Sequence, residues 1–244
     1  MSTLSDYLPR TGDHVFDPRS VQVEPEEFCP AEPQVCEPTS FAEEQIRGLI
    51  RQVFYPGWPK PSRQVVFSAV DADTDIREIC MQVGLALSAQ VPGSTCVVEA
   101  DSNGEGLEGF ANSNGLHPMP VEDGAGLREV SRRLSKQLCL VPRDFFLGPN
   151  GNSTSGSWMR DQLAELRRTF DYTVIHGPAA AGRSETALLG SQCDGVVLVV
   201  DANSTRRVTA QKVKEKLQSS NARLLGIVLN QRTFPIPEVI YRKF

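Results

Sequence analysis

An excess of basic charge, long apolar runs and recognisable cysteine patterns are all missing from this sequence of 244 residues. The formal net charge of −5 argues against a nucleic-acid-binding protein, which usually carries a basic face. No apolar run is long enough to cross a membrane, and no charged-then-apolar leader opens the chain, so we expect a cytoplasmic protein. Cys29 and Cys36 have the spacing of no zinc motif, and the other four cysteines stand in apolar or helical patterns. Neither a zinc site nor a disulfide framework is expected.

Proline and glutamate are frequent in the first 40 residues, which hold too little apolar content to fold alone. Residues 1–40 are therefore predicted to form a flexible N-terminal arm, with an extended segment that docks on a partner as the alternative. The folded domain is predicted at 41–244. It opens with a helix in the stretch TSFAEEQIRGLIRQVF, where Thr39 or Ser40 can serve as N-cap and Glu43 completes a capping box.

Strand and helix patterns alternate from residue 65 onward. The predicted strands are 65–68, 95–99, 172–176, 196–201 and 224–230, and the predicted helices are 76–90, 126–136, 157–170, 183–190 and 205–219. Most of these strands are continuous apolar runs, which indicates burial on both faces and a mainly parallel sheet. We therefore expect an α/β protein with a three-layer fold, in which helices cover both faces of a central sheet. Any ligand is expected beyond the carboxyl ends of the strands.

The first strand continues into a loop and a helix, VVFSAVDADTDIREICMQVGLALSAQ, with the build of a phosphate-binding P-loop. A working P-loop needs glycines so that the backbone can wrap the phosphates, a lysine for their charge and a hydroxyl for magnesium. This loop contains neither glycine nor lysine. Asp73, Asp75, Ile76 and Arg77 stand at the motif positions, within about one residue. The two aspartates would repel a triphosphate, and only Arg77 brings a compensating charge.

The acidic loop has two other interpretations. An aspartate at a helix N-terminus satisfies the unpaired N–H groups there, so Asp73 or Asp75 is predicted to cap the helix that begins near Ile76. The D-x-D-x-D spacing also opens a calcium-binding EF-hand loop, but that motif needs glycine at the position of Ile76 and glutamate at the position of Gln82. The sequence therefore predicts capping and no metal site.

Three further strand ends carry polar residues. Glu99 and Asp101 would activate a hydroxyl or order magnesium in an enzyme, or would form a solvated turn. His176 stands where a magnesium-ordering Walker B strand has an acid; a packed or hydrogen-bonded histidine is the simpler expectation, since magnesium prefers oxygen ligands. Asn230 ends the last strand, where its amide would read an adenine edge or hydrogen-bond to its own backbone.

The stretch FDYTVIHGPAAAGRSETALLGSQCDGVVLVVDANSTRRVTAQKVKEKLQSSNARLLGIVLNQ resembles the C-terminal half of the bacterial tyrosine autokinases (BY-kinases) of capsule and exopolysaccharide synthesis. TCVVEADSNGEG is similar to the second Walker strand of that family. The resemblance covers residues 41–232 and implies the P-loop NTPase-like fold of the deviant-Walker, MinD/ParA-like class. EEQIRGLIR resembles the family's E-x-x-R-x-x-R helix. This implies a subunit interface at Glu44, Arg47 and Arg51, although Arg51 stands one residue late, and an ordinary solvated helix face is the alternative.

The departures from the family pattern lie at its catalytic positions. The P-loop glycines, lysine and hydroxyl are missing; Glu99 replaces the first Walker A′ aspartate and His176 replaces the Walker B aspartate, while Asp101 is retained. A lone Tyr241 stands where the family has a tyrosine cluster. The loss of a phosphate-clamping cation or of its metal typically costs several kcal/mol of transition-state stabilisation. The resemblance therefore implies a catalytically degenerate member.

We expect a regulatory or scaffolding component of exopolysaccharide or capsule synthesis or export, without catalytic residues or cofactor and with weak Mg-ATP binding at most. Its expected partner is an active family kinase or the cytoplasmic end of a chain-length-determining membrane protein, which would hold it at the inner membrane; a homo-oligomer is compatible with the interface helix. The alternative is an atypical ATP-binding tyrosine kinase or ATPase that uses Arg77, Glu99, Asp101 and Asn230. A partitioning or positioning ATPase, a third class, is disfavoured by the acidic charge and the missing lysine.

Overall fold

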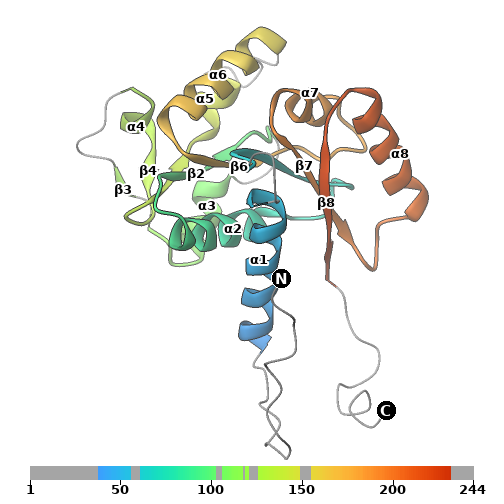
Figure 1. The fold of residues 1–244 in the computed structure, drawn as a ribbon, viewed down its shortest axis with the longest axis horizontal. Helices are drawn as coiled ribbons and strands as arrows, with labels where there is room; N and C mark the ends of the chain where they lie inside the picture. The colour runs from blue at the N-terminus through green and yellow to red at the C-terminus, as the bar shows by residue number, and fades with distance from the viewer. Residues whose placement is uncertain are drawn as a thin grey trace, which may run out of the picture. The chain divides into compact units, whose positions relative to one another are not determined.

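The structure, a computed structural model, describes residues 38–55, 61–102, 106–117, 119–120, 126–148 and 155–231 (Figure 1). Within these ranges the chain forms a three-layer α/β fold around one mainly parallel sheet, as the sequence predicts. The helices are α1 (Pro38–Phe54), α2 (Arg77–Gln90), α3 (Leu107–Ser113), α4 (Leu127–Val130), α5 (Arg143–Leu147), α6 (Gly156–Thr169), α7 (Glu185–Gln192) and α8 (Arg207–Ser219). The strands are β1 (Gln64–Ala69), β2 (Thr95–Glu99), β3 (Met119–Pro120), β4 (Arg132–Arg133), β5 (Leu138–Val141), β6 (Tyr172–His176), β7 (Gly195–Asp201) and β8 (Leu224–Asn230).

The strands of the sheet lie in the order β3-β4-β5-β2-β6-β1-β7-β8. All pairs from β5 to β8 are parallel, whereas β3 and β4 pair antiparallel at one edge. β1 and β2 are buried along their whole length, which confirms the two-sided burial inferred from their apolar runs. Because β6 lies between β1 and β2, the carboxyl ends of these three strands meet at one edge of the sheet. The candidate site is built there.

Apolar side chains alternate between the two faces of the sheet. Val66 and Val98 pack in one core with α5, α6, α7 and α8. Their neighbours Val65 and Val97 pack in the other core with α1, α2 and α3, on the opposite face (Figure 1). The period of two along each strand therefore supplies two separate apolar layers, and these layers hold the strand ends in fixed positions.

The predicted helix at 126–136 is wrong beyond its first turn. α4 ends at Val130, and the chain then passes through β4 into β5, which pairs in parallel with β2. Leu127, Val130 and Leu134 recur at helical spacing, so the apolar pattern alone could not distinguish a helix from a turn and two short strands. The buried pairing of β5 with β2 decides for the strand. The short helices α3 and α5 were not predicted either.

The helix α1 begins earlier than the sequence predicts. Its backbone is already helical from Pro38, so the predicted N-cap at Thr39 or Ser40 is wrong. Ile50 is fully buried and packs α1 against the core that α2 and α3 share. The remainder of the predicted arm, residues 1–37, lies outside the described residues. Among the described helices, none combines the length and the apolar character that a membrane crossing requires.

The amino ends of the central strands are held by Asp194, at the start of the DGVVLVV stretch. One of its carboxylate oxygens accepts hydrogen bonds from the backbone N–H groups of Arg63 and Gln64, at 2.7 and 2.8 Å. The other oxygen accepts from the Arg167 guanidinium at 3.0 Å. Burial would raise the pKa of the Asp194 carboxyl, but the two backbone hydrogen bonds and the Arg167 charge together lower it. Asp194 therefore joins β1, α6 and β7 at the end of the sheet opposite the candidate site.

Candidate functional site

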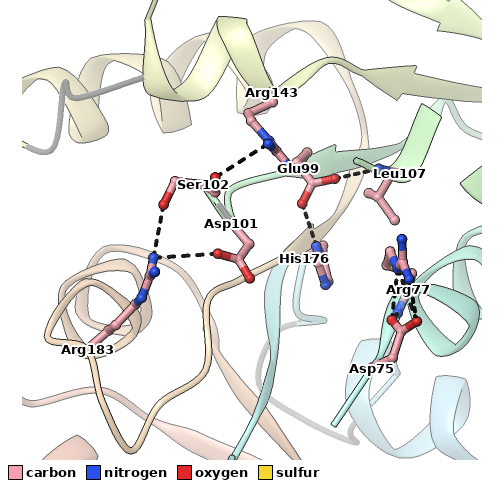
Figure 2. Close-up of polar contacts among 9 residues, drawn as sticks. All are labelled: Asp75, Arg77, Glu99, Asp101, Ser102, Leu107, Arg143, His176 and Arg183. Carbon is pink, nitrogen blue, oxygen red and sulfur yellow. Dashed lines mark hydrogen bonds and ion pairs between the residues drawn. The ribbon is translucent and has the colours of Figure 1, made fainter. Parts of the chain in front are cut away.

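The loop between β1 and α2 is closed by its own aspartate. Asp75 Oδ1 accepts a hydrogen bond of 3.0 Å from the backbone N–H of Arg77, the first residue of α2. The Arg77 guanidinium turns back to the same carboxylate, with Nη2 2.7 Å from Oδ2 (Figure 2). The prediction that Asp75 caps the helix is therefore confirmed in one respect, since its carboxylate binds the first N–H of α2. The N-cap position itself is occupied by Ile76. Asp73 is exposed and makes no hydrogen bond to any described residue.

The pair of Asp75 and Arg77 alters the electrostatics of the loop. The side-chain hydrogen bond from Arg77 is the main cause that lowers the pKa of Asp75, and the backbone N–H of Arg77 and the charge of His176 act in the same direction. Arg77 also lies over the Phe110 ring, 5.3 Å from its centroid. A phosphate at this helix start would meet the Asp75 carboxylate where it needs N–H donors and positive charge. The loop therefore holds its own anion.

A buried carboxylate–imidazole pair lies beside this loop. Glu99 and His176 end β2 and β6 and stand opposite each other in register, so their side chains share one face of the sheet. His176 Nδ1 lies 2.7 Å from Glu99 Oε1, and both side chains are buried (Figure 2). Glu99 Oε2 accepts a hydrogen bond of 2.6 Å from the backbone N–H of Leu107, the first residue of α3. Both carboxylate oxygens of Glu99 are thus engaged within the chain.

This arrangement bears on the interpretations of the two residues. A general base or a magnesium ligand must offer a lone pair to the reacting group or the metal. The Glu99 oxygens are instead directed at His176 and at the start of α3. The hydrogen-bonded, packed role expected for His176 is confirmed, whereas a solvated turn at Glu99 is wrong because the side chain is buried. The pair ties the end of β2 to β6 and α3.

The segment after β6 packs against the end of β1. The N–H of Gly177 donates to the Phe67 carbonyl at 2.8 Å, and the N–H groups of Ala180 and Ala181 donate to the carbonyls of Ala69 and Val70. A side chain at Gly177 would place its Cβ 2.8 Å from a Val66 methyl, so only glycine allows this approach. The segment is therefore fixed next to the β1 loop, and it brings Arg183 to the site.

Two arginines converge on Ser102, just beyond Glu99. Arg183 Nη1 donates to the Ser102 hydroxyl at 3.0 Å and lies 3.5 Å from Asp101 Oδ1. Arg143, the first residue of α5, donates from Nη1 to the Ser102 carbonyl oxygen at 3.4 Å. Figure 2 shows the two guanidinium groups on opposite sides of Ser102. Ser102 is exposed, so this cluster, unlike the pair of Glu99 and His176, is open to solvent.

The other predicted site residues lie apart from this cluster. Asn230 ends the edge strand β8, separated from β1 by β7, and its backbone carbonyl accepts from the N–H of Ala202. Glu44 and Arg47 lie on the exposed face of α1, where Arg47 also pairs with Glu43 at 3.4 Å. Arg51 is exposed in the last turn of the same helix. The structure therefore brings together the ends of β1, β2 and β6, and leaves the residues of α1 as a separate surface.

Sequence reasoning missed Arg143, Arg183 and Ser102. Arg183 and Ser102 stand in strand-end loops that the sequence marks as the place for chemistry, so their position was available as a signal. Arg143 follows β5, which the helical spacing concealed. Their convergence depends on the neighbouring positions of β5, β2 and β6 in the sheet.

Comparison with known proteins agrees with this fold. No protein-family model matches the chain. The chain is 26% identical over 152 residues to the tyrosine-protein kinase CpsD of Streptococcus agalactiae, which covers 60% of this chain and 66% of that protein. The chain is a relative of the bacterial tyrosine-protein kinases. It spans 66% of the length of CpsD, so the activity and partners of the whole kinase are not carried over from the comparison.

Several solved structures share the fold at lower identity. The chimeric protein CapA2B2 aligns with a TM-score of 0.63 and 19% identity, over 83% of this chain and 88% of that chain. The kinase domain of the Escherichia coli tyrosine kinase ETK aligns with a TM-score of 0.62 and 14% identity, over 80% and 79% of the two chains. These likenesses confirm the P-loop NTPase-like fold expected from the sequence.

Proposed function

We propose that this relative of the tyrosine-protein kinases is catalytically degenerate and acts through protein contacts. The observation that carries the proposal is the engagement of Glu99, whose two carboxylate oxygens are taken up by His176 Nδ1 and the Leu107 N–H. Glu99 stands at the position that the family resemblance assigns to the first Walker A′ aspartate. A carboxylate held in this way is a weaker base and a poorer metal ligand than one whose oxygens face the reacting groups.

The β1 loop supports the same proposal. Asp75 takes the first N–H of α2 and the charge of Arg77, which are the two features that a nucleotide phosphate would require at this position. Binding of Mg-ATP would have to break this pair and bring a triphosphate next to Asp75. The affinity for Mg-ATP is therefore expected to be weak at most.

The proposed role is regulation or scaffolding in exopolysaccharide or capsule synthesis or export. Its partner would be an active kinase of the family or the cytoplasmic end of a chain-length-determining membrane protein. Support comes from the relationship to CpsD and from α1, whose exposed Glu44 and Arg47 match the helix that the family uses for assembly. Attachment to the inner membrane would then come from the partner.

Nucleotide binding is the direct test of degeneracy. Calorimetry of the full chain with Mg-ATP, with CpsD as the positive control, is expected to give no saturable binding in the micromolar range. Incubation with labelled ATP is expected to give neither hydrolysis nor phosphorylated protein. Magnesium-dependent ATP binding at micromolar concentration would overturn the proposal in favour of an atypical ATP-binding kinase or ATPase that uses Arg77, Glu99, Asp101 and Asn230.

Assembly is tested separately on α1. The double variant Glu44→Ala and Arg47→Ala should weaken self-association in sedimentation, or capture of an active family kinase in a pull-down. Because these side chains are exposed, their loss should leave the fold intact. A matched control removes Arg207 and Glu215 from the exposed face of α8. If the α1 variant and the α8 variant behave alike in both assays, α1 is an ordinary solvated helix.

A further inference from the structure

Two cysteines stand next to each other in a row of residues that crosses the strands β4, β5, β2 and β6. Cys139 on β5 is in register with Cys96 on β2, and both are free thiols. The row continues to Arg133 on β4 at one end and to Thr173 on β6 at the other. Residues in register on neighbouring strands point to the same face of a sheet. Cys96 and Cys139 accordingly pack in the same apolar core, so the two thiols are neighbours on one face.

The two cysteines have the spacing that a disulfide bond requires. Neighbouring strands lie about 4.7–4.9 Å apart, and the Cα atoms of bonded cysteines are usually about 4.4–6.8 Å apart. Burial raises the pKa of the Cys96 thiol, the hydrogen bond with Thr173 opposes this, and the nearby Cys139 raises the pKa further. The last effect agrees with two sulfur atoms that lie close together. A bond between them would join strands that are already paired.

The surroundings of the two thiols differ. Cys96 is fully buried, and its Sγ donates to Thr173 Oγ1 at 3.5 Å. Cys139 is only partly buried, so a small oxidant can approach it from solvent. Burial raises the pKa of the Cys139 thiol, whereas the charges of Arg128 and Arg133 lower it and so favour the reactive thiolate. Cys139 is therefore the thiol that an oxidant meets first, and Cys96 is the thiol beside it.

The other two cysteines of the described residues have no such neighbour. Cys80 lies on α2 and packs in the core on the opposite face of the sheet. Cys193 lies just before β7, and both β6 and β1 separate β7 from β2. Within the part of the chain that the structure describes, Cys96 and Cys139 are thus the one pair of cysteines in register on neighbouring strands. Cys80 and Cys193 serve as internal controls.

We infer that Cys96 and Cys139 form a site of reversible oxidation, which takes a small hydroperoxide such as hydrogen peroxide and yields a disulfide bond between β2 and β5. The Cys139 thiolate attacks one peroxide oxygen, so that an S–O bond forms and the O–O bond breaks. The hydroxide that leaves takes up the proton that Cys139 gave up and becomes water. Cys139 is then a sulfenic acid.

The second step closes the disulfide. The Cys96 sulfur attacks the Cys139 sulfur, so that the S–S bond forms and the S–O bond breaks. The hydroxyl leaves with the proton of Cys96 as a second water. Two thiols thus lose two electrons, and one peroxide is reduced to two waters. A dithiol such as dithiothreitol reverses the reaction by thiol–disulfide exchange.

This site is independent of the proposed function, because it needs neither nucleotide nor a protein partner. It also agrees with the absence of a disulfide framework expected from the sequence, since the bond forms only on oxidation. Once formed, it would fix the edge strand pair of β4 and β5 to β2 by a covalent link. The link would join the strand that ends at Glu99 to the strand that leads to Arg143.

Peptide mapping after oxidation is the direct test. The full chain carries Cys29→Ser and Cys36→Ser, so that the two cysteines outside the described residues do not react. It is treated with hydrogen peroxide, the reaction is stopped with catalase, and the remaining thiols are alkylated in denaturant. Mass spectrometry without reduction should find one peptide pair linked through Cys96 and Cys139. Cys80 and Cys193 should be alkylated, and dithiothreitol should restore both thiols of the pair.

Substitutions of each thiol separate the two steps. Cys96→Ala should leave a sulfenic acid on Cys139, which dimedone traps, whereas Cys139→Ala should leave Cys96 as a thiol. Cys193→Ala is the matched control and should form the disulfide at the rate of the unsubstituted pair. Arg133→Gln should slow the loss of the two thiols by about threefold, because it removes a charge that favours the thiolate. Thermal melting checks folding, and Cys96→Ser replaces Cys96→Ala where folding is lost.

The linked peptide, formed within one chain, reversed by dithiothreitol and absent from the Cys96 and Cys139 variants alone, supports the inference. Oxidation of Cys139 to a sulfenic or sulfinic acid while Cys96 stays a thiol would show that the two sulfur atoms do not meet, and would overturn it. A linkage to Cys80 or Cys193, or a linkage between two chains, contradicts the pairing in register. If neither thiol reacts at millimolar peroxide, the site is wrong.

Discussion

Two groups of polar side chains meet at the end of β2, one at Glu99 and one at Ser102, and their surroundings differ. Glu99 is buried and paired with His176, and its remaining oxygen accepts the N–H of α3. Ser102 is exposed and lies between Arg143 and Arg183. In the first group, the sealed pair, both Glu99 oxygens already have partners within the chain. The second group, the open cluster, faces solvent.

Because their burial differs, the two groups are expected to contribute differently to the stability of the fold. A buried charged group that loses its partner is left without solvation, so the sealed pair is expected to control stability. Exposed ion pairs contribute little to stability, because solvent screens them and their side chains lose entropy. The open cluster is therefore expected to contribute little to the stability of the fold. Variants in the two groups test this difference.

Glu99→Ala should give the largest effect. The variant leaves His176 and the Leu107 N–H without a buried acceptor, so the free energy of unfolding should fall by about 3–5 kcal/mol. Glu99→Gln retains an acceptor and should lose less. Urea denaturation of the three proteins measures the difference. A loss below about 1 kcal/mol in Glu99→Ala would show that the sealed pair does not hold the end of β2.

Asp194→Ala should rank second, at the opposite end of the sheet. It removes the acceptor of two backbone N–H groups and of Arg167, so about 2–3 kcal/mol of stability should be lost at neutral pH. The pKa of Asp194 in the folded protein is below its ordinary value of 3.8. Its contribution is therefore fully present above that ordinary value and is lost as the pH falls through the lowered pKa.

The pH dependence supplies the check on Asp194. Chemical denaturation across acid pH should show the gap between wild type and Asp194→Ala closing below the ordinary aspartate range. A gap that stays constant down to the acid unfolding limit would mean that packing, and not the carboxylate, accounts for the loss.

Asp75→Ala should cost about 0.5–2 kcal/mol, the usual effect of losing a helix-capping acceptor. Asp75→Asn should cost less, since it still accepts the Arg77 N–H but loses its charge. Asp73→Ala is the matched control in the same loop and should change stability by less than about 0.5 kcal/mol, because Asp73 is exposed. Melts with and without Mg-ATP distinguish capping from phosphate binding. If the loop were a phosphate-binding site, Asp75→Ala would keep the stability of the wild type and would bind ATP more strongly.

Arg183→Gln should give the smallest change in stability, about 1 kcal/mol or less, since its ion pair with Asp101 is partly exposed. Urea denaturation of the variant and of the wild type measures the change in the free energy of unfolding. A variant that destabilises the fold as much as Glu99→Ala would show that the open cluster is structural.

Much of the fold could be predicted from the sequence because strand burial is a local pattern. The five longest strands were found within one or two residues, since an apolar run marks each of them. The segment 126–141 could not be read in the same way. Its leucines fit a helix equally well, and only the pairing of β5 with β2 selects the strand.

For the candidate site, too, local features could be predicted from the sequence and contacts between distant residues could not. The sequence by itself determined that the β1 loop lacks the glycines and lysine of a phosphate cradle, and that Asp75 stands close to a helix start, because these are matters of residue identity and short spacing. It also placed Glu99, Asp101 and His176 at strand ends. Only the tertiary structure decided their roles, because Glu99 and His176 are 77 residues apart and meet only where β6 is inserted between β1 and β2. The order of the strands in the sheet likewise brings Arg143 and Arg183 to Ser102. The sequence could not predict this, because the pairing of distant strands leaves no periodic pattern along the chain.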